Sequence, residues 1–428
     1  MVKNVTGLHA QNAPAPPEAQ ADVARNGAGS GHDPFSWKID AWWDRVTKIQ
    51  EEENYYYFQP VEELDGPWVT TEGKRKLMLA TYTYLGLLDH PRIVAAAKAA
   101  IDKYGAGTHG VRILGGTLDL HAEMERTIAN FVGRDDAIVY SSGYVTNLAT
   151  ISTLVGTGDW VLSDKWNHAS IVDGCVLARG EFKRYRHNDM DDLEKQLRRA
   201  PESAGKLVVA DAVFSMDGDI FNLPDAVDIC RRYNARLMVD EAHSLGVLGA
   251  TGHGIEEHFG MAGSIDVMMG TLSKTIPGIG GYIAGDKKLI NFLRHTARGF
   301  VFSAALPPAV VGAIIEAFHV LEDEGVERNE SLARTVRHFI GGLQAVGFDT
   351  GMTVTPIVPI MVGREDIAMQ MTKYCQDHGV FVLPVLPPAV QEGAARLRAN
   401  VTAAHSPADI DFALGVFTAA GREAGVIK

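Results

Sequence analysis

Five short polar stretches, each after a short apolar run, carry the side chains of this sequence that are best suited to chemistry. In chain order they contain Ser141 to Tyr144, Asp164 and His168, Asp211 and Ser215, Asp240 and His243, and Gly270 to Lys274. A lone loop histidine is more often structural than catalytic, and an aspartate after a strand is often only a helix cap. Two histidines, two carboxylates and a lysine at one sheet edge are harder to explain in that way, and they indicate a site.

Lys274 lies in the stretch GTLSKTIPGIGGYIAG at 270–285. A solvated surface lysine is the common interpretation of such a residue. A lysine held among helix termini and hydroxyl groups can instead become a nucleophilic amine and form a Schiff base with an aldehyde. Pyridoxal phosphate is the aldehyde that fits, since it needs a carboxylate at its pyridinium nitrogen and backbone N–H groups around its phosphate. Asp240 suits the first need, and Ser141 to Tyr144, at the start of a predicted helix, suit the second.

Short apolar runs alternate with segments of helical length between about residues 90 and 300. The runs lie at 137–140, 160–162, 207–210, 236–239 and 267–269. This alternation predicts an α/β fold with a mostly parallel central sheet flanked by helices. Ligands of such sheets bind beyond the carboxyl ends of the strands, which is where the polar stretches fall.

The pattern changes after about residue 305 and predicts a smaller α+β domain. It consists of helices at 308–324 and 329–346, an apolar run at 356–361 and a final helix at 407–423. We therefore expect a large cofactor-binding domain over 86–305 and a small C-terminal domain over 306–428.

The N-terminal part divides into a tail and a structured segment. Residues 1–34 are rich in Ala, Pro and Gly, cannot bury enough apolar surface to order themselves, and predict a disordered tail. Within an N-terminal segment over 35–85, residues 42–53 predict a helix. The aromatic cluster at 55–58 is expected to be core or, alternatively, an interface patch.

The composition excludes several classes of function. The 428 residues carry a net charge of −13, from 40 basic and 53 acidic side chains, so nucleic acid and anionic membranes should be repelled. Three cysteines without CxxC spacing, Cys175, Cys230 and Cys375, favour a reducing compartment and no metal site. No apolar stretch reaches the roughly 18 residues of a membrane span, and we expect a cytoplasmic protein.

Several of these stretches resemble the signature sequences of the α-oxoamine synthases. They are SSGYVTNLATISTL (141–154), NHASIVDGC (167–175), VFSMDGD (213–219), DEAHSLGVLGATGHG (240–254) and GTLSKTIPGIGGYIAG (270–285). The resemblance runs from about residue 40 to the C-terminus, in order and at family-like spacing. It implies a fold-type I pyridoxal-phosphate enzyme that condenses an amino acid with an acyl thioester and releases carbon dioxide.

Position by position, the resemblance implies roles at the cofactor. Lys274 would form the Schiff base, Asp240 would hold the pyridine nitrogen, and His168 would stack on the ring; these three are the expected catalytic residues. His243 would hydrogen-bond the phenolic oxygen. Further cofactor contacts are implied for Gly143, Tyr144, Ser215, Thr271 and Ser303.

The resemblance also implies a site for the amino-acid substrate. Arg398, in ARLRANVTAAH, matches the family arginine that grips the substrate carboxylate, as a planar guanidinium does well. Thr83 would lie near the same carboxylate. If the segment is a strand, Arg396 is expected to face the other way.

The chain departs from the family pattern at a few positions. Thr83 stands where an asparagine is usual, and Val111 where a serine is usual. Ile276-Pro277 replace a usual Phe-Gly, and Ala304-Ala305 replace hydroxyl residues in a segment that usually reaches the neighbouring subunit's phosphate. These departures bear more on the choice of amino acid than on the reaction type.

Within the family, three stretches look closer to the soluble bacterial serine palmitoyltransferases than to the biotin-pathway or haem-pathway members. They are YRHNDMDDLEKQL, PVLPPAVQEGAARLR and LGVFTAAGREAGVI. This resemblance implies L-serine and a long-chain acyl thioester, on coenzyme A or a carrier protein, as substrates, and a homodimer with sites at the interface. Another α-oxoamine synthase, an aminotransferase and a non-catalytic partner subunit are the alternatives, and Lys274 argues against the last.

Overall fold

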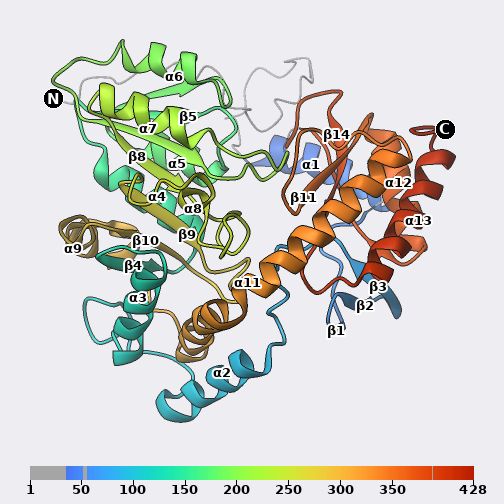
Figure 1. Cartoon of the computed structure of the whole chain (residues 1–428), viewed down its shortest axis with the longest axis horizontal. Helices are drawn as coiled ribbons and strands as arrows, with labels where there is room; N and C mark the ends of the chain where they lie inside the picture. The colour runs from blue at the N-terminus through green and yellow to red at the C-terminus, as the bar shows by residue number, and fades with distance from the viewer. Residues whose placement is uncertain (1–34, 52–54, 388) are drawn as a thin grey trace.

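The computed structural model describes residues 35–51, 55–387 and 389–428, and Figure 1 shows two lobes connected by one long helix. The expected disordered tail at 1–34 lies outside the described residues. The helix expected at 42–53 begins earlier, because α1 spans Ser36–Glu51, and residues 52 and 53 again lie outside.

The larger lobe is built on a seven-stranded sheet in the order β4-β10-β9-β8-β7-β5-β6. Its strands are β4 (Asp136–Tyr140), β5 (Trp160–Asp164), β6 (Glu181–Tyr185), β7 (Lys206–Asp211), β8 (Arg236–Asp240), β9 (Val267–Thr271) and β10 (Gly281–Gly285). Only β10 runs antiparallel to its neighbours. The predicted α/β fold with a mostly parallel sheet is therefore confirmed, and all five predicted strands are present.

Helices cover both faces of this sheet, which is why its central strands are apolar between their charged ends. The helices of the larger lobe are α2 (Pro91–Tyr104), α3 (Asp119–Phe131), α4 (Gly143–Leu154), α5 (Ala169–Leu177), α6 (Met190–Leu197), α7 (Leu223–Arg232), α8 (Ile255–Phe259), α9 (Lys287–Thr296) and α10 (Arg298–Val301). One apolar cluster joins one sheet face to α4, α5, α9 and α10. The other cluster packs α3 and α7 on the opposite face and continues into the smaller lobe.

The smaller lobe contains two small sheets. A three-stranded antiparallel sheet has the order β11-β14-β13, with β11 at Ile357–Gly363, β13 at Leu383–Val385 and β14 at Ala395–Asn400. A four-stranded sheet has the order β1-β2-β3-β12, with strands Glu63–Asp65, Trp68–Thr71, Lys74–Met78 and Val380–Phe381. Helices α12 (Glu365–Asp377) and α13 (Pro407–Glu423) pack beside them.

The pairing of β3 with β12 ties the N-terminal segment to the C-terminal part of the chain. The buried Lys76 ammonium donates to Gln376 Oε1 at 2.9 Å across the same junction. The domain limits expected at residues 85 and 305 stay a prediction.

One long helix, α11 (Pro308–Ala345), replaces the two helices expected at 308–324 and 329–346. The polar stretch between them suggested a break, but its side chains have tertiary partners. Asn329 Nδ2 donates to the carbonyl oxygens of Gly246 and Val247 at 3.1 and 3.0 Å, and Arg328 donates to the Leu85 carbonyl at 3.1 Å. The prediction of two helices was wrong because these contacts hold a polar segment in helical form.

The aromatic cluster at 55–58 is core only in part. Tyr56 is buried, whereas Phe58 is 95% exposed. The three cysteines are buried and free, as small core residues. Within the described residues, no helix is long and apolar enough to cross a membrane.

Candidate active site

The parallel strands bring the predicted polar stretches to one edge of the sheet. Asp211 and Asp240 end the neighbouring strands β7 and β8 and are register partners. Thr271 ends β9, and the segment with Lys274 follows directly. The carboxyl ends of these strands thus carry two acids and a lysine side by side, as the sequence predicted.

Lys274 follows β9 in a turn that is fixed by its neighbour, since Thr275 Oγ1 donates to the Leu245 carbonyl at 2.7 Å. Within the described residues, the Lys274 ammonium makes no hydrogen bond or ion pair. Burial lowers its pKa, while the charges of Asp240 and Asp211 act in the opposite direction. A lysine with a lowered pKa is a better nucleophile and base near neutral pH.

Asp240 is buried, and its carboxylate is held by two donors. Asn147 Nδ2 donates to Asp240 Oδ2 at 2.7 Å, and the Ala242 N–H donates to Oδ1 at 2.9 Å. Asn147 also donates to Ser170 Oγ at 3.0 Å. The position of Asp240 is thereby fixed from helix α4, a link that the sequence analysis missed.

His168 caps the N-terminus of α5 and is exposed to solvent. Its N–H donates to Asp211 Oδ2 at 2.9 Å, and its Nδ1 accepts from the Ser170 N–H at 3.3 Å. Desolvation by the surrounding protein lowers the His168 pKa although Asp240 favours the charged form. A neutral, solvent-accessible ring suits stacking on a flat aromatic group.

His243 is buried next to two tyrosines. Its Nδ1 lies 2.6 Å from the hydroxyl of Tyr84, which is fully buried. Burial lowers the pKa of His243 well below its usual value, and the charges of Lys274 and Arg398 add to this effect. His243 is therefore neutral at physiological pH.

The ring of Tyr82 lies among the charged residues of the site. Its centroid is 5.7 Å from the Lys274 Nζ, 4.9 Å from the Arg398 Cζ and 5.8 Å from the His243 ring. Tyr82 was not among the residues predicted from the sequence, whereas its neighbour Thr83 was. The Thr83 hydroxyl instead lies 3.0 Å from the hydroxyl of Thr81. A cation–π interaction of about 0.5–2 kcal/mol is expected from such a ring.

Arg398 reaches the site from β14 of the smaller lobe. Its Nε donates to the Ser215 carbonyl at 2.5 Å, and its Nη2 is buried without a hydrogen-bond partner among the described residues. This contact involves the backbone of Ser215, whose side chain was predicted to touch the cofactor. The free N–H groups of a buried guanidinium are suited to a carboxylate.

Arg396 does not face the other way, and that prediction was wrong. Residues two apart in a strand lie on the same face, and both arginines reach the same loop. Arg396 Nη1 forms an ion pair with Asp217 at 2.5 Å. Arg396 therefore anchors the loop after β7, whereas Nη2 of Arg398 has no hydrogen-bond partner among the described residues.

The N-terminus of α4 faces the end of β9. Ser142 caps the helix, and the N–H groups of Gly143 and Tyr144 have no hydrogen-bond partner among the described residues. A Cβ at Gly143 would lie 2.9 Å from Thr271 Oγ1. The helix can approach Thr271 only because position 143 has no side chain, and this leaves donors for an anionic group.

Tyr144 lies at the margin of the site. Its ring makes an edge contact with His168, at 6.2 Å between centroids, and its hydroxyl donates to Asp173. Hydrogen bonding to that carboxylate raises the Tyr144 pKa. Tyr144 therefore lies beside the His168 ring, and the cofactor contact expected for it stays a prediction.

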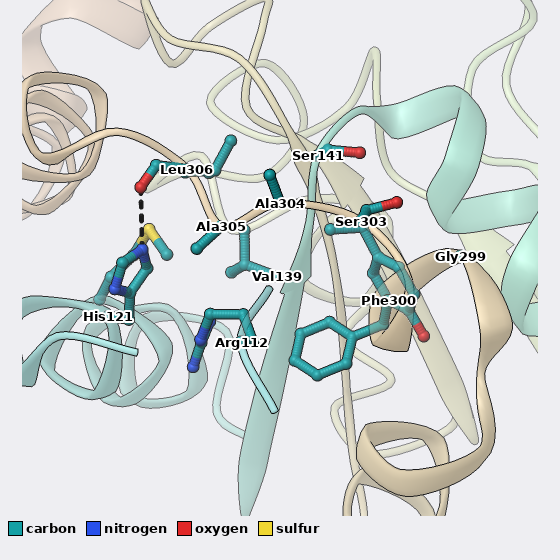
Figure 2. A pocket seen from close by; sticks show the side chains of 12 residues that line it. Arg112, His121, Val139, Ser141, Gly299, Phe300, Ser303, Ala304, Ala305 and Leu306 are labelled. Carbon is teal, nitrogen blue, oxygen red and sulfur yellow. Dashed lines mark hydrogen bonds between the residues drawn. The ribbon is translucent and has the colours of Figure 1, made fainter. Parts of the chain in front are cut away.

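Figure 2 shows a small pocket beside the start of α4, bordered by Ser141 and Ser303. Arg112 and His121 lie on its other side. Arg112 forms a bidentate pair with Glu125 at 3.0 and 3.1 Å, and His121 Nε2 lies 3.0 Å from the Leu306 carbonyl. Ser303 and Ser141 thus line the same pocket. The guanidinium of Arg112 is already paired with the Glu125 carboxylate.

The arrangement fits pyridoxal phosphate. Asp240 provides a buried carboxylate; within the described part of the chain, Lys274 provides an unpaired amine and the start of α4 two free N–H groups. In addition, Asn147 Oδ1 and Arg398 Nη2 are buried polar atoms without partners among the described residues. Unsatisfied buried groups of this kind mark ligand sites, because they cost free energy unless a ligand pairs with them.

Comparisons with known proteins agree with this geometry. Residues 74–417 match the family model "Aminotransferase class I and II". A serine palmitoyltransferase of Sphingobacterium spiritivorum is 42% identical over 86% of this chain and 92% of its own length. An 8-amino-7-oxononanoate synthase of Bacillus velezensis is also 42% identical, over 88% of this chain and 96% of its own.

A solved serine palmitoyltransferase that holds pyridoxal phosphate as an internal aldimine has the same fold. The two chains superpose with a TM-score of 0.90 at 38% identity, covering 92% of this chain and 100% of the other. The chain is therefore a pyridoxal-phosphate-dependent α-oxoamine synthase of the class I and II aminotransferase family.

Proposed function

We propose that the chain is a serine palmitoyltransferase. It condenses L-serine with a long-chain acyl thioester, palmitoyl-CoA, and releases carbon dioxide, which gives 3-ketodihydrosphingosine. The observation that carries the proposal is the convergence of three groups: Lys274, Asp240 and Arg398. Among residues 35–51, 55–387 and 389–428, the lysine has no hydrogen bond or ion pair, the carboxylate is buried, and the Nη2 of the guanidinium has no hydrogen-bond partner. The match to a solved serine palmitoyltransferase over that protein's whole length supports the choice within the family.

Each residue of the site has a proposed role toward the cofactor. Asp240 would hold the ring nitrogen, His168 would pack on the ring face and His243 would donate to the phenolic oxygen. The N–H groups of Gly143 and Tyr144 would bind the phosphate. Thr271 and Ser303 border the same group, from β9 and from the pocket of Figure 2.

The reaction needs a proton to leave the amino-acid α-carbon. Pyridoxal phosphate, when bound, supplies an electron sink that stabilises the negative charge left there. The Lys274 amine, with its lowered pKa, accepts this proton. Asp240 keeps a positive charge at the ring nitrogen favourable, because its carboxylate stays fixed by Asn147.

Substrate orientation is assigned to the smaller lobe. The free N–H groups of Arg398 bind the substrate carboxylate, and the ring of Tyr82 holds the guanidinium in place from one side. The Ser215 carbonyl holds it from another. A fixed carboxylate fixes the direction of the Cα–H bond relative to the lysine amine.

We also propose a homodimer. The isolated bridge between Val111 and Ala304 joins two segments that expose large apolar side chains, with Leu114 80% and Phe302 73% exposed. Apolar side chains clustered on a surface mark protein interaction sites. Sedimentation equilibrium of the holoenzyme tests this, and a monomer at micromolar concentration would contradict it.

The test of the reaction combines a panel of amino acids with a panel of thioesters. Serine, glycine and alanine are offered with acyl chains of increasing length on coenzyme A and on a carrier protein, and carbon dioxide release and products are measured. We expect serine with a chain of about 16 carbons to give the highest kcat/KM. A preference for another pair would assign the chain to a different α-oxoamine synthase, and amino transfer to a keto acid without carbon dioxide would overturn the reaction.

A further inference from the structure

A histidine outside the proposed catalytic set connects two loops of the site. His187 follows strand β6, next to Asn188. Its Nδ1 lies 3.0 Å from Asp164 Oδ1, at the end of β5, and its Nε2 lies 2.8 Å from Asp219 Oδ2, in the loop after β7. Both ring nitrogens face carboxylates, so both must carry protons, and the side chain is an imidazolium.

The two carboxylates belong to loops that carry functional residues. The loop after β5 leads from Asp164 through Trp166 to His168. The loop after β7 contains Ser215, whose carbonyl accepts from Arg398, and Asp217, which pairs with Arg396. His187 therefore lies between the residue proposed for the cofactor face and the loop that holds the arginine proposed for the substrate.

Packing fixes the imidazole between these loops. Trp166 stacks on it with ring centroids 3.9 Å apart and planes at 15°, and Phe214 meets it edge-on at 4.4 Å. Asn188, with a φ of 49°, adds a second tie, because its Nδ2 donates to the Ile220 carbonyl at 2.9 Å. A non-glycine residue in the left-handed region costs energy and is retained where the surroundings require that geometry.

The loop after β7 is held from the opposite side by the smaller lobe. Thr353 and Thr355 hydroxyl groups donate to the Gly218 carbonyl at 3.2 and 3.0 Å. A Cβ at Gly218 would collide with Thr353 and with the Ile357 carbonyl. The loop is thus a link between the lobes, with the imidazole on one side and two threonines on the other.

We propose that His187 is a positioning residue that clamps the loop carrying His168 to the loop on which Arg398 rests. The inference rests on the proposed role of Arg398 as the carboxylate site. Without the imidazolium, Asp164 and Asp219 lose a shared cation, the two loops separate, and the Ser215 carbonyl no longer fixes Arg398. His187 acts on the substrate through these loops and touches neither substrate nor cofactor.

The test compares His187→Asn with His378→Asn. His378 is a matched control, because it too stacks on an aromatic ring, that of Tyr374 at 3.9 Å, but among the residues that the structure describes it pairs with no carboxylate. The holoenzymes are titrated with serine, glycine and alanine, and cofactor absorbance gives the dissociation constants. Hydrogen exchange of peptides covering 164–168 and 214–219 is measured in parallel.

We expect His187→Asn to weaken binding of the responding amino acid about tenfold, with unchanged cofactor content and faster exchange in both loops. Its KM should rise more than its kcat falls. Asp219→Asn should weaken binding similarly and add little in the double variant, because both changes break one bridge.

Two results would overturn the clamp. One is unchanged affinity and exchange in His187→Asn; the other is an equal loss in His378→Asn. If His187→Asn does not fold, the isosteric Asp219→Asn decides alone, and normal affinity there counts against the clamp. An enzyme that responds to alanine rather than serine defeats the proposed substrate, but the responding amino acid still tests the clamp.

Discussion

Lys274 combines two properties that a surface lysine lacks. Its half-buried side chain is desolvated enough to lower its pKa, and within the described residues no acceptor is bonded to its amine. Asp240 and Asp211 nearby limit the shift, so the amine stays available for protonation and deprotonation during one reaction cycle. Both properties result from the position of Lys274 just after the end of β9, where other strands of the sheet surround it, and not from the neighbouring residues in the sequence.

Replacing Lys274 with alanine should remove the visible absorbance of the bound cofactor and lower kcat by at least about a thousandfold, since Lys274 is the amine that follows the end of β9. Spectra and turnover of the purified variant measure both effects. Lys287→Ala, at the exposed start of α9, is the control and should match the wild type. A borohydride-reducible link to the cofactor in Lys274→Ala would show that another residue is the nucleophile.

The two arginines of β14 show what a sequence can and cannot assign. The resemblance selected Arg398, and the structure gives it a free N–H group at the site. The prediction that Arg396 faces the other way was wrong, because strand periodicity places both side chains on one face. Only the position of Asp217 reveals that Arg396 is occupied. Tyr82 and Asn147 were missed because their roles depend on contacts with residues far away in the sequence, Arg398 and Asp240, which a local sequence pattern does not predict.

Arg398→Ala should raise the dissociation constant of the amino acid about tenfold to a hundredfold, because charge-assisted hydrogen bonds contribute about 1.5–3 kcal/mol. The spectrum of the bound cofactor without substrate should stay unchanged. Titration of the holoenzyme measures both. Arg364→Ala, which removes an exposed pair with Asp366, is the control. Equal affinities in wild type and Arg398→Ala would place the carboxylate elsewhere.

Thr83→Asn restores the residue usual in the family and tests a departure noted in the sequence. The Thr83 hydroxyl lies against Thr81, so an asparagine must give up that contact before it can reach a substrate. We expect a change in relative affinity among serine, glycine and alanine of about threefold or more, with unchanged cofactor binding. Spectral titration of the three amino acids measures it, and unchanged ratios would remove position 83 from the pocket.

At the scale of elements, the hydrophobic pattern of the sequence predicted those strands and helices whose apolar side chains are buried in the core. The five predicted strands are buried runs between helices, and α13 matches its predicted bounds. Strand β6 was missed, because as an edge strand it carries charged residues in EFKRY and shows no apolar run. The error in α11 had the opposite cause, since a polar stretch became helix through contacts with distant carbonyl groups.

The start of α4 gives a prediction that belongs to the element. Gly143→Ala places a Cβ 2.9 Å from Thr271 Oγ1, so the helix end must move and its free N–H groups turn away from the phosphate. We expect the dissociation constant of pyridoxal phosphate to rise about tenfold. Absorbance titration of the apoenzyme measures it.

Gly341→Ala in α11 is the matched control for this substitution. Nothing lies within 4 Å of its added Cβ, and alanine in a helix interior is favoured by about 1 kcal/mol. This variant should bind the cofactor normally and be slightly more stable. Normal cofactor affinity in Gly143→Ala would mean that the phosphate lies away from the helix end.

At the scale of the whole molecule, the site joins both lobes. The larger lobe supplies Lys274, Asp240 and His168, and the smaller lobe supplies Arg398 (Figure 1). The residues of the larger lobe are those proposed to bind the cofactor, and Arg398 of the smaller lobe is the one proposed to bind the substrate carboxylate, so the proposed site needs both lobes. No sequence pattern encodes the contact between Arg398 and Ser215, which are 183 positions apart, so the resemblance to a family was needed to place them together.

The junction between β5, β6 and β7 also predicts how the stability of the whole enzyme changes in alkaline solution. Burial alone would lower the His187 pKa, but hydrogen bonds to Asp164 and Asp219 outweigh it and raise the pKa from 6.5 to about 9. A raised folded-state pKa gives stability that is complete below pH 6.5 and is lost as the pH rises through about 9. By linkage, the difference corresponds to about 3 kcal/mol.

Between pH 6.5 and 9, the thermal midpoint of the wild-type holoenzyme should therefore fall by a few degrees more than that of His187→Asn. At fixed scan rate, the difference between the two proteins isolates His187 from other titrating groups, because these are shared. His378→Asn should follow the wild type. If the midpoints of wild type and His187→Asn fall in parallel, His187 is not protonated in the native enzyme at pH 8, and the imidazolium bridge between the loops does not exist. A slope that flattens only in His187→Asn would instead assign the alkaline loss to this one bridge at the junction of the strands.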